Sequence, residues 1–203
     1  MPKDKTATHQ RLYECMRREF LEKGFEKASL NNIAKQVGIT PAAVYRHYPS
    51  KEAMFEALVK PVVDDFNKIC NEYMKDMTED DVKSHIAGGY ADFEDDILDY
   101  LYEHFDEFKL LVDCAKGTKY ENFFDVFVEL EEKSSAHMMD MLKKSGYECP
   151  EVTPIQHHIA ATMYMAGMYE IIRHNMPKEK AVECIRFTYD FYEAAWQSLL
   201  KLK

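Results

Sequence analysis

The chain has 203 residues, of which 46% are hydrophobic, enough apolar surface for a packed core. Its formal net charge is −10 at pH 7, and no stretch approaches the roughly 20 apolar residues that a membrane-spanning helix requires. The sequence therefore excludes a protein with transmembrane helices, and its few glycines and prolines (seven of each) favour long helices joined by short loops.

The N-terminus and the cysteines indicate a cytoplasmic location. The first ten residues are polar and lack the apolar core of a signal peptide. Five cysteines are scattered along the chain, and no pair has metal-ligand spacing, so we expect free thiols in a reducing compartment.

The charge is unevenly distributed. Residues 1–52 carry ten basic and six acidic side chains, whereas the remainder carries 16 basic and 30 acidic ones. A basic N-terminal part on an acidic body presents one end to a polyanion. An ordinary acidic, soluble surface explains the remainder equally well.

The N-terminal part predicts a helix-turn-helix. A helix over about Thr6–Lys23 ends at Gly24, and a second helix carries an apolar stripe between Ser29, a good N-cap, and Gly38, a good C-cap. A third, short helix begins at Thr40 and Pro41. Val44 and Tyr48 are expected to point inward, which leaves an outer row: Ala42, Ala43, Tyr45, Arg46 and His47.

The run from Gly38 to Glu52 reads G-I-T-P-A-A-V-Y-R-H-Y-P-S-K-E. It resembles the DNA-binding signature of the TetR family of transcriptional regulators, whose usual form is close to G-V-S-x-G-T-L-Y-x-H-F-x-S-K-E. The resemblance implies an all-α homodimer in which residues 1–51 form a helix-turn-helix DNA-binding domain. Residues 52–203 would then form a helical domain for effector binding and dimerisation.

The same resemblance assigns roles to individual residues. Tyr45, His47 and Lys51 would hold phosphates with help from Ser29, and Arg46 would read a base edge. Ala42 and Ala43 replace the usual glycine and hydroxyl residue, which leaves the operator sequence open. The candidate DNA-binding residues are Ser29, Asn31, Asn32, Thr40, Pro41, Ala42, Ala43, Tyr45, Arg46, His47 and Lys51.

The remaining sequence predicts only helices, with no β pattern and no repeat. A helix over about residues 50–77 contains Pro61, which should kink or divide it. The last two helices carry apolar residues on more than one face, as expected for helices that pack on their own domain and on a second subunit. The expected helices after residue 77 cover about 80–104, 105–116, 120–145, 154–175 and 177–202.

The body is rich in residues that line adaptable apolar pockets and that also fill ordinary cores. We expect a small, largely apolar effector, with a lipophilic cation and an uncharged molecule both open. The candidate effector-binding residues are Phe66, Tyr100, Phe124, Phe127 and Met163.

No catalytic, metal or cofactor motif is present in the sequence, so we expect no enzyme activity, no metal and no cofactor. The predicted function is a DNA-binding regulator, expected to be a repressor, that acts as a homodimer on palindromic double-stranded DNA. The alternatives are an acidic helical scaffold or ligand-binding protein without operator binding and, less favoured, a helical enzyme. Operator, effector, regulated genes and the choice between repression and activation stay open.

Overall fold

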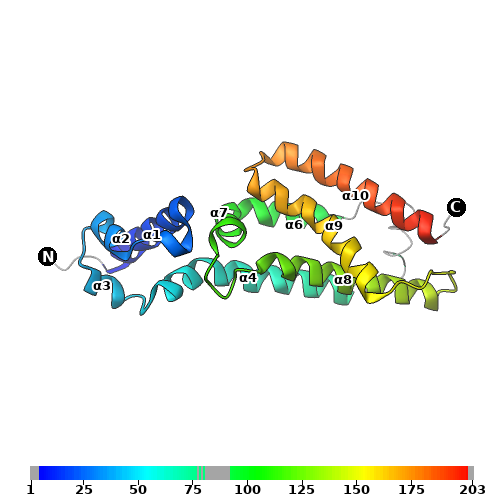
Figure 1. The fold of residues 1–203 in the computed structure, drawn as a ribbon, viewed down its shortest axis with the longest axis horizontal. Coiled ribbons are helices and arrows are strands. Elements are labelled where there is room, and N and C mark those ends of the chain that lie inside the picture. Colours follow the sequence, from blue (N-terminus) through cyan, green and yellow to red (C-terminus); the bar gives the residue numbers. More distant parts are fainter. Residues whose placement is uncertain (1–4, 77, 79, 81–91, 201–203) are drawn as a thin grey trace. The chain divides into compact units, whose positions relative to one another are not determined.

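The computed structural model describes residues 5–76, 78, 80 and 92–200 (Figure 1). Every regular element in these residues is helical, which confirms the predicted all-α class. None of the described helices combines the length and apolar character needed to cross a bilayer. The elements are α1 (Lys5–Lys27), α2 (Leu30–Val37), α3 (Pro41–Tyr45), α4 (Lys51–Asp76), α6 (Asp92–Glu103), α7 (Phe105–Lys109), the π-helix η1 (Leu110–Cys114), α8 (Phe123–Lys144), α9 (Pro154–Arg173) and α10 (Lys178–Leu200).

The chain forms two compact units. The first contains the described residues up to Phe66 together with His104–Asn122, and the second contains Asn67–Glu103 and the chain from Phe123 onward. The chain therefore passes between the units three times, the first time within α4. The first unit is larger than the expected DNA-binding domain of residues 1–51, because the start of α4 and the α7–η1 segment pack with the N-terminal helices. The functional boundary after residue 51 stays a prediction.

Two charged side chains of α1 hold α2 at its two ends. Glu19 is only 2% exposed, and its carboxylate accepts hydrogen bonds from the backbone N–H of Ser29 (3.1 Å) and from the side-chain amides of Asn32 and Gln36. Arg11 donates to the Val37 carbonyl at the other end of α2 (2.9 Å). A negative charge at a helix N-terminus and a positive charge at its C-terminus both interact favourably with the helix dipole. The pair thus stabilises α2 and fixes its antiparallel register on α1.

The core of the first unit is aromatic and aliphatic. Phe20 and Phe25 stack, and both pack edge-on against Phe55 of α4. Phe108 of α7 meets Phe66 edge-on, with ring centroids 5.6 Å apart. Edge-to-face pairs of this kind add about 0.5–1.5 kcal/mol beyond the area they bury. The start of α4 is therefore a core element shared by the N-terminal helices and the α7–η1 segment.

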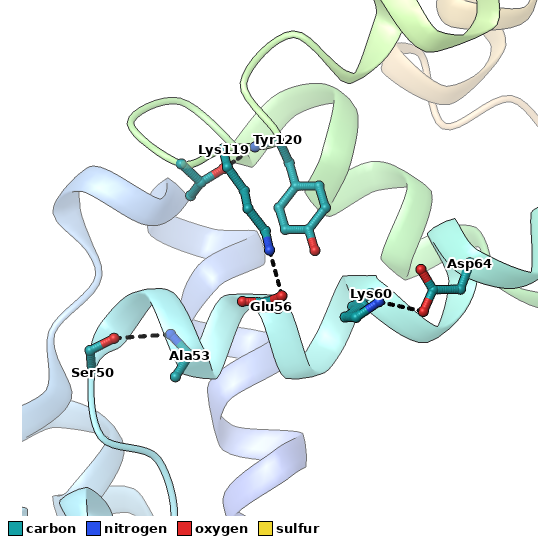
Figure 2. Close-up of polar contacts among 8 residues, drawn as sticks. Ser50, Ala53, Glu56, Lys60, Asp64, Lys119 and Tyr120 are labelled. Carbon is teal, nitrogen blue, oxygen red and sulfur yellow. Dashed lines mark hydrogen bonds and ion pairs between the residues drawn. The ribbon is translucent and has the colours of Figure 1, made fainter. Parts of the chain in front are cut away.

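Polar contacts at the surface of the first unit reinforce the same packing (Figure 2). Lys119, in the loop after η1, pairs with Glu56 of α4, and Lys60 pairs with Asp64 one turn further along that helix (Figure 2). Arg17 of α1 lies 3.5 Å from Asp106 and 3.8 Å from Glu107 of α7. Apart from Glu107, which is buried, the side chains of these pairs are largely exposed, so each exposed pair contributes little to stability.

The second unit is a helical assembly in which α9 packs against both α8 and α10, and α6 packs against α10. Leu98 of α6 lies in a cluster of buried residues with Ile171, Ala181 and Ile185. The Tyr102 hydroxyl donates to the Met176 carbonyl at 2.6 Å, which connects α6 to the turn between α9 and α10. A second cluster, Met139, Leu142 and Leu200, joins α8 to the end of α10.

Three of the expected helices can be compared with the structure in detail. α4 continues as one element through Pro61, so of the two alternatives expected there, a kink or a division, the structure shows no division. The helix expected over 105–116 becomes a turn of α-helix followed by the π-helix η1. The helix expected over 80–104 is seen as α6, and residues 81–91 lie outside the described part. Gly24 has φ 71° and ψ 164°, a non-helical conformation, as expected of a residue that ends the first helix.

We predict that Glu19→Ala lowers the free energy of unfolding by about 2–3 kcal/mol, because a buried backbone donor and two amides lose a charged acceptor. Urea unfolding of the full chain, followed by circular dichroism, measures the change. The control is Glu22→Ala, an exposed glutamate of the same helix, whose effect should stay within about 0.5 kcal/mol. Equal effects of the two variants would show that Glu19 does not hold α2.

Candidate nucleic-acid interface

α2 is defined at both ends by interactions that the sequence predicted. The Ser29 hydroxyl accepts from the backbone N–H of Asn32 at 3.4 Å, and Gly38 ends the helix at φ 75°, donating its N–H to the carbonyls of Ala34 and Lys35. Ile33, Ala34 and Val37 are buried, so the predicted apolar stripe faces the core. α2 is thereby a rigid support for the turn that follows.

The turn leads directly into α3. The Thr40 hydroxyl accepts from the backbone N–H of Ala43 (3.2 Å), and Pro41 occupies the first helical position, where its missing N–H costs nothing. Val44 is completely buried and Tyr48 nearly so, which confirms that these two residues point inward. Caps and inward anchors therefore hold a five-residue helix that would not be stable alone.

One face of α3 and of the turn after it is open. Tyr45 is 51% exposed, and Pro41, Ala42, Arg46 and His47 are also exposed, while Ala43 is half-buried. This outer row offers two small side chains beside a phenol, a guanidinium and an imidazole. Small residues permit close approach, and the three polar groups donate hydrogen bonds, the combination needed to reach phosphates and base edges.

Two of the predicted contact residues are engaged within the protein. The Asn32 side-chain amide donates to Glu19, although Asn32 and its neighbour Asn31 are both exposed residues at the start of α2. The Lys51 ammonium donates to the backbone carbonyls of Glu26 (3.1 Å) and Ala28 (3.5 Å). It also lies 4.6 Å from the centre of the Phe25 ring, a cation–π contact.

Lys51 therefore joins the first turn of α4 to the segment between α1 and α2. The backbone at the start of α4 is a separate feature: the Ser50 hydroxyl accepts from the Ala53 N–H at 3.1 Å (Figure 2). The free N–H groups of this first turn favour an anion. Any phosphate contact at this point would come from that backbone more readily than from the Lys51 side chain.

Solved structures with the same fold cover almost the whole chain. A TetR-family transcriptional regulator, PfmR from Thermus thermophilus, aligns with a TM-score of 0.59 at 19% identity, covering 91% of this chain and 97% of that one. NalD, the secondary repressor of the MexAB-OprM multidrug efflux pump in Pseudomonas aeruginosa, aligns with a TM-score of 0.55 at 20% identity over 92% and 96%. At these identities the likeness shows the fold.

The N-terminal sequence is similar to one known family. Residues 16–58, which run from α1 into α4, match the family described as bacterial regulatory proteins, tetR family. The chain therefore carries a TetR-type N-terminal region, and as a whole it has the fold of solved TetR-family regulators. The recognition made from the Gly38–Glu52 run is thus confirmed, and with it the DNA-binding regulator fold.

Curated relatives match either a short part of the chain or most of it. The nucleoid occlusion factor SlmA of Mannheimia succiniciproducens is 49% identical over 41 residues, 20% of this chain and 19% of that protein. The chain thus matches about a fifth of the length of that relative. An HTH-type transcriptional regulator of Staphylococcus aureus strain USA300 is 25% identical over 179 residues, 81% of this chain and 91% of that protein.

Sequence reasoning missed one residue of this interface, His9 of α1. Its ring lies 5.9 Å from the His47 ring, centroid to centroid, and is stacked on Tyr48 at the same distance. His9 is exposed and 38 positions away from His47, so nothing in the local sequence pattern connected the two.

The five candidate effector residues come from both units. Phe66 belongs to the first unit, where it packs on Phe108, and the other four belong to the second. Phe124 packs edge-on against Tyr169 of α9 (4.8 Å), Phe127 against Phe123, and Tyr100 is half-buried on α6. Met163 is 64% exposed, on the outer side of α9.

We predict that Lys51→Met lowers the free energy of unfolding by about 1 kcal/mol, because two backbone carbonyls and the Phe25 ring lose their cation. Thermal and urea unfolding of the full chain measure it. Lys35→Met, at an exposed position of α2, is the control and should change stability by less than about 0.5 kcal/mol. Identical stabilities would contradict the structural role of Lys51.

Proposed function

We propose that this protein is a sequence-specific regulator that binds palindromic double-stranded DNA as a homodimer, and that a small effector bound in its second unit releases it. The outer row of α3 carries the proposal. It combines a fixed backbone, two alanines and three donors on a face that the rest of the first unit leaves open.

Arg46 is the residue best suited to read a base. It is exposed, and within the described residues its guanidinium has no recorded ion pair or hydrogen bond. A guanidinium donates two parallel hydrogen bonds to the guanine edge in the major groove. Tyr45 and His47, on either side of it, are placed to donate to backbone phosphates, with Asn31, Thr40 and the first turn of α4 nearby in the sequence. The Asn32 and Lys51 side chains support this surface through their contacts within the protein.

A second copy of the chain is needed because one five-residue helix contacts few base pairs. The outer sides of α9 and α10 suit that copy. Ile155, Ile159 and Met163 recur every four residues on α9, and all three are exposed. On α10, Phe187 and Phe191 are 73% and 65% exposed. Large exposed apolar rows mark an interaction surface, and two such helices from each copy would form a four-helix interface.

The close approach of α9 and α10 keeps these rows side by side. A Cβ atom added to Gly167 would meet the Thr188 side chain at 3.2 Å, so the glycine permits the two helices to approach. The homodimer in turn sets the separation of the two α3 helices. For adjacent major-groove segments that separation is about 34–36 Å, or a multiple of it.

Release by a small molecule rests on the aromatic composition of the second unit. Tyr164 and Tyr192 stack at 4.5 Å, and Phe124 meets Tyr169 edge-on. Burial raises the pKa of Glu193 to about 7, so this carboxyl is partly neutral at neutral pH. Such surroundings suit a largely apolar ligand. A repressor role agrees with NalD, which is named as a repressor, and a cytoplasmic location is what such a role requires.

The alternative is a helical ligand-binding or scaffold protein without operator binding. It requires that the open face of α3 contact nothing, although that face lies within residues 16–58, the region that matches the family model. Selection of duplexes from a random-sequence pool by the full-length protein separates the two functions. Enrichment of a palindrome supports the regulator, and absence of enrichment at low salt supports the alternative.

For the selected duplex, Arg46→Ala should cost about 1–3 kcal/mol and relax the preference at one position of each half-site. Tyr45→Phe should instead weaken selected and unselected duplexes alike, since it removes only a phosphate contact. Gel-shift titrations at fixed salt measure both. Lys133→Ala, an exposed cation on α8, is the control. If Arg46→Ala leaves both affinity and base preference unchanged, α3 does not read the DNA.

The double variant Phe187→Glu with Phe191→Glu should be monomeric at micromolar concentration and should bind the palindrome far more weakly, because four like charges would meet across the interface. Sedimentation velocity gives the mass, and circular dichroism verifies that the helices persist. Ala136→Glu on the exposed side of α8 serves as control. A wild-type chain that sediments as a monomer would remove the dimer from the proposal.

A further inference from the structure

We propose that His9 and His47 form one phosphate-binding pair, so that DNA binding is coupled to proton uptake by these two histidines. The inference rests on the proposed DNA-binding function and adds to it a contact residue from α1 and a dependence on pH. The ligand is a phosphodiester of the DNA backbone.

A core residue, Tyr48, fixes the position of the His9 ring beside His47. Tyr48 is nearly fully buried, next to the completely buried Val44, and the His9 ring stacks on the Tyr48 ring with an interplanar angle of 20°. His47 immediately precedes Tyr48 in the chain. The two imidazoles are therefore brought together at 5.9 Å by a core residue while both remain exposed.

Two imidazoles at this separation suit one phosphate group. Each protonated ring donates a charge-assisted hydrogen bond, and the two donors can reach different oxygens of the same phosphate. A bound phosphate carries a permanent negative charge, which favours the protonated form of an imidazole beside it. Binding should therefore draw protons onto the pair.

The other titratable groups around the two histidines do not take up protons in their place. Burial raises the pKa of Tyr48 and of Tyr13, one turn along α1 from His9, so both phenols stay neutral in this range. Arg46, next to His47, remains positive throughout. At the start of α4, Lys51 is bound to backbone carbonyls, and the Glu52 carboxylate is bound to its own backbone N–H and to Ser50. No carboxylate of the described residues contacts either imidazole.

The test measures the affinity of the full-length protein for its selected, fluorescently labelled duplex between about pH 6 and pH 8 at constant ionic strength. The wild-type affinity should rise as the pH falls, by up to about tenfold per pH unit for each linked proton. His9→Gln and His47→Gln should each flatten this dependence, and the double variant should abolish most of it.

His137→Gln, at an exposed position of α8, should behave as wild type. Calorimetric titration near neutral pH in two buffers of different ionisation enthalpy should give an uptake of about one proton per protomer, lost in the double variant. A wild-type affinity independent of pH, or a pH dependence that survives in both single variants, would overturn the histidine pair while leaving DNA binding intact. Failure to bind any duplex at any pH would overturn the proposed function and the pair with it.

Discussion

The buried carboxylate of Glu19 is the contact on which the rest of the N-terminal unit depends. It accepts from the Ser29 backbone and the Asn32 amide at the start of α2, while Arg11 holds the carbonyl at the end of that helix. α2 has only eight residues and would not persist alone. A short turn joins α3 to α2. The position of every hydrogen-bond donor on the open face of α3 therefore depends on how α1 holds α2. Burying this carboxylate costs desolvation free energy. Its three hydrogen bonds, and the alignment of α2 that they enforce, offset that cost.

Residues of the same type near α3 have different roles in the structure. Lys51 and Arg46 are both cations of the Gly38–Glu52 run. The Lys51 ammonium is engaged by two carbonyls and the face of Phe25, whereas the Arg46 guanidinium lies at a surface with no recorded partner in the described residues. Asn31 and Asn32 divide in the same way. Some of the polar residues near α3 therefore shape the reading surface, and others are available to touch a ligand.

What the sequence predicted well was local. The caps at Ser29, Gly38, Thr40 and Ser50 are each formed within about four residues, so side-chain type and spacing are sufficient to predict them. Other contacts join residues 10 to 38 positions apart: Glu19 with Ser29, Lys51 with Glu26, and His9 with His47. No periodicity in the sequence encodes such pairs. Met163 shows a related limit. On a helix that is apolar on two faces, the sequence pattern is the same whether an apolar residue lines an interior or faces outward. Pro61 lies inside the single helix α4, and the buried residues Phe55 and Phe66 on either side of it hold that helix in the core.

The division into units bears on how an effector could act. The chain passes between them at residues 66–67, 103–104 and 122–123, and the α7–η1 segment belongs with the N-terminal helices. α4 is therefore one of three covalent connections between the second unit and the unit that holds α3. Exposed pairs such as Lys119–Glu56 are each too weak to supply the 1–3 kcal/mol or so of coupling that regulation needs. The buried contact between Phe66 and Phe108 joins two of those connections inside the apolar core, so a shift of one of them must either carry the other or break that packing.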